Sequence, residues 1–149
     1  MYFSMVVSMQ KNNIRSHFHC VYNLNYHLVL VTKYRKKCFS NQILAQLEDI
    51  MNNVTLKWDC EILEFGGEPD HVHLLIKAHP AMDMSKYVNN LKTVSSRLIK
   101  KKHPKHFKRF YWKPALWTRS YCLLTTGGAT AEVIKKYIEK QGGQNSSPP

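Results

Sequence analysis

Paired cysteines are missing from this 149-residue sequence. Its four cysteines, Cys20, Cys38, Cys60 and Cys122, stand singly, and no two of them form a Cys-x-x-Cys pair. This pattern argues against a structural zinc site. Scattered single cysteines are typical of a reducing cytosol, where they pack as small hydrophobic groups.

Long apolar runs are missing as well. No stretch reaches the ~18 apolar residues that a membrane-spanning helix needs. The first residues, 1–9, are apolar but few, and positive charges come only after them, which is not the order of a signal peptide. We therefore expect a soluble, cytoplasmic protein with no membrane partner. The length predicts a single domain that buries a real core.

Acidic residues are absent from two long parts of the chain. Residues 1–47 and 84–131 carry no Asp or Glu, and the formal net charge is +12. Such a balance predicts attraction to a polyanion, for which nucleic acid is the usual candidate and an acidic membrane surface the alternative. Folding could join the two segments into one basic face. We predict that the DNA-binding residues come from both segments: Lys33, Arg35, Lys36, Lys37, Lys100, Lys101, Lys102 and Arg109.

Hydrophobic periodicity predicts the order of the elements. Strands are expected at 22–30, 60–65, 71–77 and 116–125, and helices are expected after Ser40, after Asp83 and from about Thr130 to Gln141. Residues 66–70 are expected to form a turn. The order β-α-β-β-α-β-α predicts a ferredoxin-like α+β sandwich, with one antiparallel sheet and its helices on one face.

The two ends of the chain are expected to lie outside this domain. Residues 1–20 show no clear period and are interpreted as an N-terminal arm, which leaves 21–141 as the domain. Gly142 is well placed to end the last helix. The Gly/Ser/Pro-rich residues 142–149 are expected to be a disordered tail.

His71 and His73 are the first candidate site. Residues i and i+2 of a strand point the same way, so both imidazoles leave one face of the sheet, close enough to bind one ion. Two ordinary histidines on the solvent-facing side of the strand are the alternative. Nearby residues have weaker cases. His27 could approach the metal but is interpreted as a surface histidine. Three acids could supply a further ligand or a proton acceptor but are interpreted as solvated turn acids, with Asp70 the best functional candidate: Glu64, Glu68 and Asp70.

Tyr137 and Gln141 are the second candidate site. Residues i and i+4 are neighbours on one helix face. A tyrosine hydroxyl, with its usual pKa of about 10, becomes an effective nucleophile toward a phosphate when a divalent metal stabilises the developing charge. Gln141 offers a neutral oxygen to such a metal. The alternative is that Tyr137 packs in an apolar helical stripe with Ile134 and Ile138.

Four stretches together resemble a known family. They are Tyr26-His27-Leu28-Val29 running into Lys33-Tyr34-Arg35, Pro69-Asp70-His71-Val72-His73-Leu74-Leu75, Leu116-Trp117 with Ser120-Tyr121, and Ile134-Lys135-Lys136-Tyr137-Ile138-Glu139-Lys140-Gln141. In this order and spacing the chain resembles the single-tyrosine transposases of the small insertion sequences, members of the HUH (His-hydrophobe-His) superfamily. The resemblance covers about 22–141, and the basic, aromatic stretch 100–113 is its least familiar part.

The resemblance implies a mechanism. His71, His73 and Gln141 would hold Mg²⁺ or Mn²⁺, and Tyr137 would attack a DNA phosphate to form a 5′-phosphotyrosine link and a free 3′-OH. The substrate implied is single-stranded DNA with hairpins near the element ends. Homodimers with composite active sites are implied, in which the tyrosine helix of one subunit completes the metal site of the other.

Two alternatives share parts of this interpretation. A domesticated relative that processes genomic hairpin repeats would keep the same metal and tyrosine residues. A non-catalytic single-stranded nucleic-acid-binding protein of ferredoxin-like form would instead use aromatic side chains. Four aromatic residues in the basic stretch could stack on bases or pack in the core: Phe107, Phe110, Tyr111 and Trp112.

Overall fold

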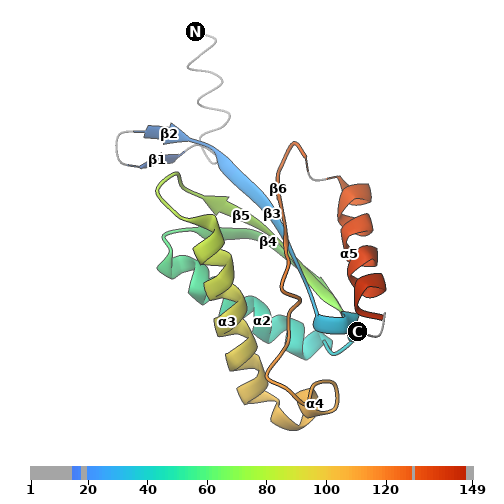
Figure 1. Ribbon diagram of the computed structural model, residues 1–149. Coiled ribbons are helices and arrows are strands. Elements are labelled where there is room, and N and C mark those ends of the chain that lie inside the picture. Colours follow the sequence, from blue (N-terminus) through green and yellow to red (C-terminus); the bar gives the residue numbers. More distant parts are fainter. Residues whose placement is uncertain (1–14, 18–19, 129, 147–149) are drawn as a thin grey trace.

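The computed structural model describes residues 15–17, 20–128 and 130–146. Its centre is a four-stranded antiparallel sheet in the order β4-β5-β3-β6 (Figure 1). The strands are β3 (Leu24–Val31), β4 (Glu61–Glu68), β5 (His71–Ala78) and β6 (Cys122–Thr125). The helices are α2 (Asn41–Lys57), α3 (Met84–Lys102), α4 (Pro104–Lys108) and α5 (Ala131–Ser146), with the 3-10 turn η1 at Lys33–Arg35.

The two long helices begin where their capping residues predict. The Ser40 hydroxyl accepts a hydrogen bond from the Ile43 amide at 3.2 Å, and the Asp83 carboxylate accepts one from the Lys86 amide at 3.1 Å. Each cap satisfies an amide that the first helical turn leaves without a partner. The α+β sandwich with one antiparallel sheet, predicted from the sequence, is confirmed.

The helices cover both faces of the sheet, so the expectation that they share one face is wrong. Helices α2 and α3 pack with Leu28, Leu30 and Leu74 in the main core. Helix α5 covers the opposite face of the sheet (Figure 1). There Ile138 packs with Val29, Val31 and Cys122 in a second, smaller cluster. Alternate residues of β3 are thus buried on opposite faces because each face has its own helical cover.

Several boundaries differ from the sequence-based expectation. A short pair of strands, β1 (Arg15–His17) and β2 (Cys20–Tyr22), occupies part of the predicted arm. Strand β4 continues through both glycines to Glu68, so the turn is shorter than predicted. Strand β6 begins at Cys122, and of its predicted first half only Trp117 forms a bridge, to Thr32.

Two helical segments were also misjudged. Helix α4 lies within the basic, aromatic stretch 100–113, where no separate helix is predicted from the sequence, and His106 within it contacts the backbone oxygen of Cys38 at 2.6 Å. Helix α5 runs on to Ser146, so Gly142 does not end it. The rest of the predicted tail, 147–149, and the arm residues 1–14 lie outside the described residues. Within the described part of the chain, no helix is long and apolar enough to cross a membrane.

Candidate active site

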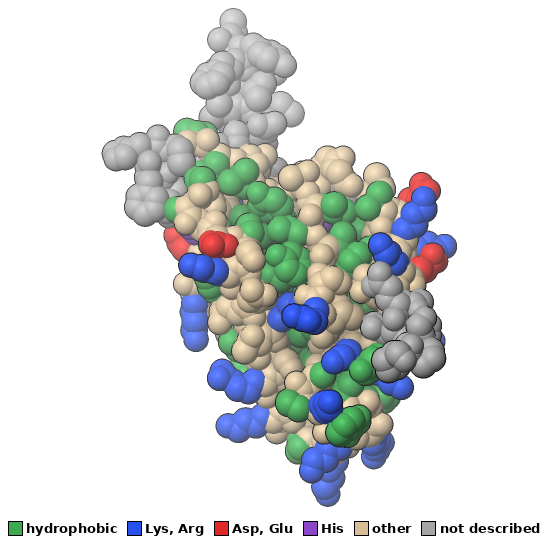
Figure 2. All heavy atoms as spheres, in the orientation of Figure 1, with side chains coloured by type: hydrophobic (Ala, Val, Ile, Leu, Met, Phe, Trp, Pro, Cys, Tyr) green, Lys and Arg blue, Asp and Glu red, His purple; other side chains and the backbone are tan. Residues whose placement is uncertain are grey.

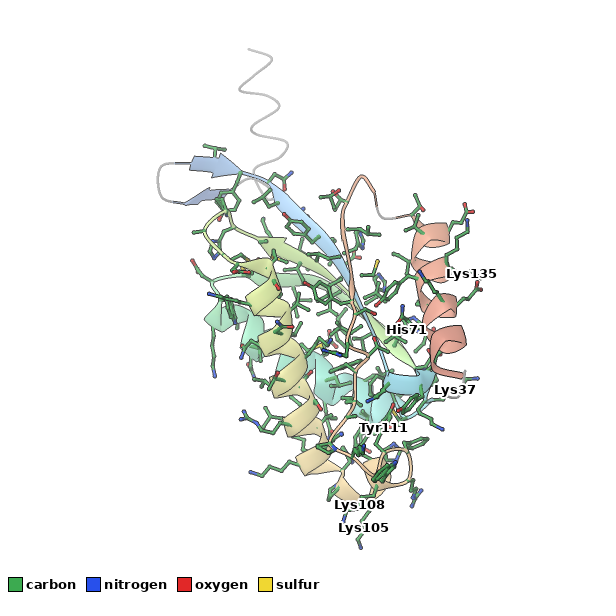
Figure 3. The ribbon with its side chains drawn as sticks, viewed as in Figure 1. Lys37, His71, Lys105, Lys108, Tyr111 and Lys135 are labelled. Atoms are coloured by element: carbon green, nitrogen blue, oxygen red, sulfur yellow. The ribbon has the colours of Figure 1, made fainter. Side chains whose placement is uncertain are left out.

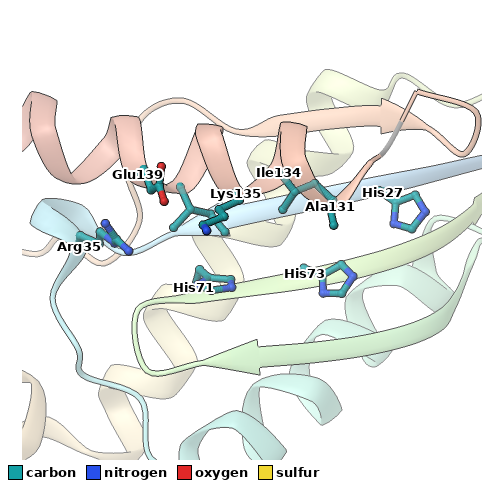
Figure 4. Close-up of a pocket in the computed structure, with 9 residues that line it drawn as sticks. His27, Arg35, His71, His73, Ala131, Ile134, Lys135 and Glu139 are labelled. Atoms are coloured by element: carbon teal, nitrogen blue, oxygen red, sulfur yellow. The ribbon is translucent and has the colours of Figure 1, made fainter.

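His71 and His73 share one face of β5, as their spacing predicts. Their neighbours Val72 and Leu74 are fully buried on the opposite face, in the main core. The two histidines line a pocket of about 470 Å³ between the sheet and α5, together with seven other residues: His27, Arg35, Ala131, Ile134, Lys135, Ile138 and Glu139 (Figure 4). The histidine face is therefore partly covered by a helix and is not simply open to solvent.

Asp70 fixes the orientation of His71. Its carboxylate lies 2.8 Å from Nδ1 of His71 and accepts a hydrogen bond from Nε of Arg35 at 2.9 Å. Asp70 is only 6% exposed, so the interpretation as a solvated turn acid is wrong. Burial by itself raises the pKa of Asp70, but the hydrogen bonds from His71 and Arg35 outweigh it and hold that pKa below its usual value. The ionised carboxylate can only accept, so Nδ1 of His71 carries a proton and Nε2 is left for a ligand.

His73 stands between a second histidine and a glycine. The ring of His27 stacks on that of His73, with 6.1 Å between the ring centroids. Burial, together with the charges of His27 and His71, lowers the pKa of His73, which favours the neutral imidazole that metal ligation requires. Gly66 pairs with His73 across the strands, and a Cβ there would lie 3.3 Å from Nδ1 of His73. Thus the glycine leaves room for the ring.

His27 is more than a surface histidine. It is half-buried, lines the histidine pocket, and its Nδ1 atom is buried with no hydrogen-bond partner among the described residues. The register of β3 on β5 places it on the same sheet face as His71 and His73.

Tyr137 and Gln141 lie together on α5, one turn apart, and both contact Ser120. The Ser120 hydroxyl is 3.0 Å from the Tyr137 hydroxyl and donates to Oε1 of Gln141 at 3.1 Å. Burial raises the pKa of Tyr137, although the Ser120 hydrogen bond opposes this, so the phenol is protonated at neutral pH. Neither residue lines the histidine pocket, which α5 instead faces with residues such as Ile134 and Glu139 (Figure 4).

The donor set fits a divalent metal in part. His71 and His73 offer two imidazole nitrogens on one sheet face, and a carboxylate bonded to the other ring nitrogen, as Asp70 is to His71, is a usual partner of a metal-binding histidine. The described residues contain no group of three or more His, Cys, Asp or Glu that could hold a metal ion. A single chain therefore supplies two imidazoles to the pocket. The Gln141 oxygen, bonded to Ser120, does not line that pocket.

The predicted basic residues fall into two groups. Lys36, Lys37, Lys101, Lys102 and Arg109 are exposed. The other three are engaged: Arg35 with Asp70, Lys100 with the Ala115 carbonyl, and Lys33 over the Tyr34 ring at 5.5 Å. Figure 2 shows Lys and Arg side chains gathered over the lower half of the molecule, and Figure 3 places Lys37, Lys105, Lys108 and Tyr111 there.

The sequence assigns no functional role to Gly66, and none to Ser120 beyond its place in one of the four stretches that resemble the family. Ser120 acts through one hydroxyl that contacts two side chains of a different element. Gly66 matters only because the strand register sets it opposite His73. Neither contact leaves a local signal, whereas Asp70 stands next to His71 in the chain and could have been ranked higher on that ground.

This geometry defines a class of protein. Its members have a ferredoxin-like sandwich, a pocket lined by paired histidines, and a tyrosine on a neighbouring helix. The family model described as "Transposase IS200 like" matches residues 20–141, which is most of the chain. The chain belongs to the IS200-like transposase family.

Individual relatives agree with this assignment. The chain is 36% identical over 121 residues to the ISDra2 transposase TnpA of Deinococcus radiodurans, covering 81% of this chain and 86% of the relative. It is 30% identical over 135 residues to the transposase for insertion sequence element IS200 of Salmonella typhimurium, covering 87% and 88%. A crystal structure from Deinococcus radiodurans superposes with a TM-score of 0.79 at 35% identity, covering 85% of this chain and 97% of that one.

Proposed function

We propose that this transposase recognises hairpins at the ends of its element and cleaves and rejoins single-stranded DNA with Tyr137 as the nucleophile. The observation that carries the proposal is the pocket on the sheet that His71 and His73 line beside the tyrosine helix, in a chain of this family. The predicted Mg²⁺ or Mn²⁺ would be held by these histidines and by Gln141. A bound divalent ion would stabilise charge on the scissile phosphate.

The step at Tyr137 is a transesterification. Its hydroxyl oxygen forms a bond to phosphorus as the phenolic proton is lost, and the bond from phosphorus to the 3′ oxygen breaks. That oxygen takes up a proton and leaves as a free 3′-OH, while the 5′ phosphate stays on the tyrosine. In rejoining, a 3′-OH attacks a phosphotyrosine link and restores the phenol. One phosphodiester is exchanged for another of similar energy, so no ATP is required.

The position of Tyr137 supports a composite site. In one chain Tyr137 and Gln141 contact Ser120 and lie outside the pocket of His71 and His73. In a homodimer, α5 of one subunit would lie beside the histidine pocket of the other. Gln141 and the nucleophile Tyr137 would then stand next to the two histidines of the partner. We therefore propose trans assembly of the active sites.

Replacement of Tyr137 by Phe tests the chemistry. This change removes one hydroxyl and leaves the ring in its apolar contacts, so the fold should persist. The covalent protein–DNA adduct should disappear because its oxygen is that hydroxyl. Adduct is measured by denaturing gel after incubation with labelled hairpin DNA and Mg²⁺. An adduct formed by Tyr137→Phe would overturn the mechanism.

The histidines provide a second, separable test. His71→Ala or His73→Ala should abolish cleavage and leave hairpin binding largely intact, because the metal serves the phosphate and not the duplex. Gln141→Ala should have a smaller effect, since water can replace one neutral oxygen ligand. Wild-type cleavage by His71→Ala would show that the site is assigned wrongly.

A protein that binds hairpin DNA and never forms an adduct would instead be the non-catalytic binding protein. A domesticated relative would form adduct and yet fail to mobilise its own flanking ends.

A further inference from the structure

A second pocket, of about 550 Å³, lies between η1 and the segment that follows α4. Apart from Ala115 its lining is basic or aromatic: Lys33, Tyr34, Lys36, Phe110, Tyr111, Trp112 and Lys113. Its volume falls within the range of roughly 300–1,000 Å³ typical of small-molecule sites. None of the described residues that line it is a carboxylate, so the charge of the pocket is positive.

Tertiary hydrogen bonds hold the two walls of this pocket together. The Lys33 amide donates to the Leu116 carbonyl at 2.7 Å, and the Tyr111 hydroxyl donates to the Lys33 carbonyl at 2.7 Å. The Lys100 ammonium on α3 donates to the Ala115 carbonyl, which fastens the second wall to that helix. Because the walls are tied at the backbone and Tyr111 is buried, the pocket exists before any ligand arrives, and binding need not order it.

Two large aromatic rings of the pocket remain exposed. Trp112 is 88% exposed and Tyr34 is 50% exposed, so neither contributes much to the core. A lysine lies over each ring: Lys113 Nζ is 4.7 Å from the Trp112 centroid, and Lys33 Nζ is 5.5 Å from the Tyr34 centroid. Exposed aromatic faces beside cations are the combination that binds single-stranded nucleic acid, through stacked bases and neutralised phosphates.

The backbone of η1 connects this pocket with the histidine site. Tyr34 and Arg35 have φ values of 61° and 53°, a left-handed conformation that non-glycine residues rarely adopt. Tyr34 lines the aromatic pocket, whereas the next residue, Arg35, lines the pocket of His71 and His73. Strained backbone of this kind tends to persist at functional positions. A single-stranded DNA that leaves the histidine pocket along η1 would therefore reach the aromatic pocket next.

We propose that this second pocket binds an unpaired nucleotide of the single-stranded DNA on which the enzyme acts. The base stacks on Trp112, with Tyr34 beside it, and Lys36 and Lys113 contact the adjoining phosphates. This inference rests on the proposed function for the identity of the strand. It adds a base-dependent contact away from the metal and the tyrosine.

The test compares a short oligothymidylate with an abasic oligodeoxynucleotide of equal length, which keeps every phosphate and lacks the bases. Binding is measured in the Tyr137→Phe background, so that no covalent step intervenes, and tryptophan fluorescence is recorded, with the share of Trp112 taken from the comparison with Trp112→Phe. We expect the abasic strand to bind about tenfold more weakly, and the oligothymidylate to quench the Trp112 emission. Trp112→Ala should remove most of this difference, and Trp112→Phe should retain most of the affinity while losing the quenching.

Matched variants separate stacking from charge. Lys113→Ala should weaken both strands alike, because it removes a phosphate contact, and Leu56→Ala, at an exposed apolar position on α2, should change neither. Equal affinity of the parent protein for the two strands, or an unchanged difference in Trp112→Ala, would overturn the proposal. Tighter binding of oligouridylate than of oligothymidylate would overturn the assignment to DNA. Adduct formation by the protein with wild-type Tyr137 is scored separately. If the two strands bind alike and adduct still forms at the normal level, the nucleotide pocket is wrong and the proposed function holds. If the strands differ as expected and no adduct forms, the proposed function is wrong and the nucleotide pocket holds.

Discussion

The Asp70 carboxylate lies 2.8 Å from Nδ1 of His71, and this contact sets which nitrogen of the imidazole faces the pocket. The ionised carboxylate accepts the proton of Nδ1 and thereby holds the ring. Because Asp70→Ala removes this acceptor, the ring should become free to rotate and to change tautomer. Loss of such a partner typically weakens metal affinity by about 10- to 100-fold. We expect this weakening for Mn²⁺, measured by isothermal titration calorimetry or by electron paramagnetic resonance.

Two variants make the Asp70 prediction specific. Asp70→Asn keeps an oxygen that can accept from Nδ1 and should lose less affinity than Asp70→Ala. Glu68→Ala removes an exposed carboxylate from the same hairpin and should leave Mn²⁺ binding unchanged. Equal Mn²⁺ affinity in Asp70→Ala and the parent protein would contradict a positioning role.

Gly66 leaves space for His73, because a Cβ at this position would lie 3.3 Å from the Nδ1 atom of that ring. The branched side chain of Gly66→Val should push the imidazole out of place. A misplacement of about 1 Å can cost roughly 100-fold in rate, so we expect adduct formation to slow on that scale while hairpin binding persists.

The control for this glycine is Gly127→Ala, because a Cβ at Gly127 meets nothing within 4 Å. Adduct formation by this variant should match the parent protein. A normal rate of adduct formation in Gly66→Val would mean that His73 tolerates displacement and that the close approach has no functional weight.

Tyr137 and the histidine pair belong to separate groups of contacts within one chain, which makes trans assembly testable. A heterodimer of a Tyr137→Phe subunit with a His71→Ala, His73→Ala subunit should recover one site of two if the tyrosine acts in trans. Adduct should then form at about half the wild-type level per heterodimer, if each site works alone. In a cis arrangement each subunit carries one defect, so a heterodimer shown to form and yet inactive would favour cis.

Exposed lysines beside η1 should make DNA binding depend on salt. Lys36 and Lys37 are exposed, in a segment without carboxylates. On single strands the log–log slope of affinity against salt is roughly −0.7 for each phosphate contact. The double variant Lys36→Ala, Lys37→Ala should therefore have a slope shallower by about 1.4, measured by fluorescence anisotropy over a salt series. Lys57→Ala, at the end of α2, offers a comparison on another element. An unchanged slope in the double variant would place the phosphates elsewhere.

Local signals predicted the elements well where the cause is local. Ser40 and Asp83 cap their helices by contacts within three residues, and the alternation through β5 follows from the two faces of a strand. Predictions failed where a distant partner decides the outcome. Asp70 is buried and bonded to Arg35, which lies far away in the chain, and β6 is shorter than predicted because only the last four residues of the predicted strand pair with β3.

The sequence by itself determined the order of the four sheet strands and the three longer helices, the shared face of His71 and His73, the helical neighbourhood of Tyr137 and Gln141, and two basic segments without acids. Each depends on residue spacing or composition, which needs no tertiary information. Only the tertiary structure decided that α5 covers the histidine face, that Tyr137 and Gln141 contact Ser120 and do not line that pocket, and that η1 meets the segment after α4 around an aromatic pocket. The physical reason is that such contacts join residues far apart in the chain. Packing of the whole molecule selects them, and no short-range pattern encodes them.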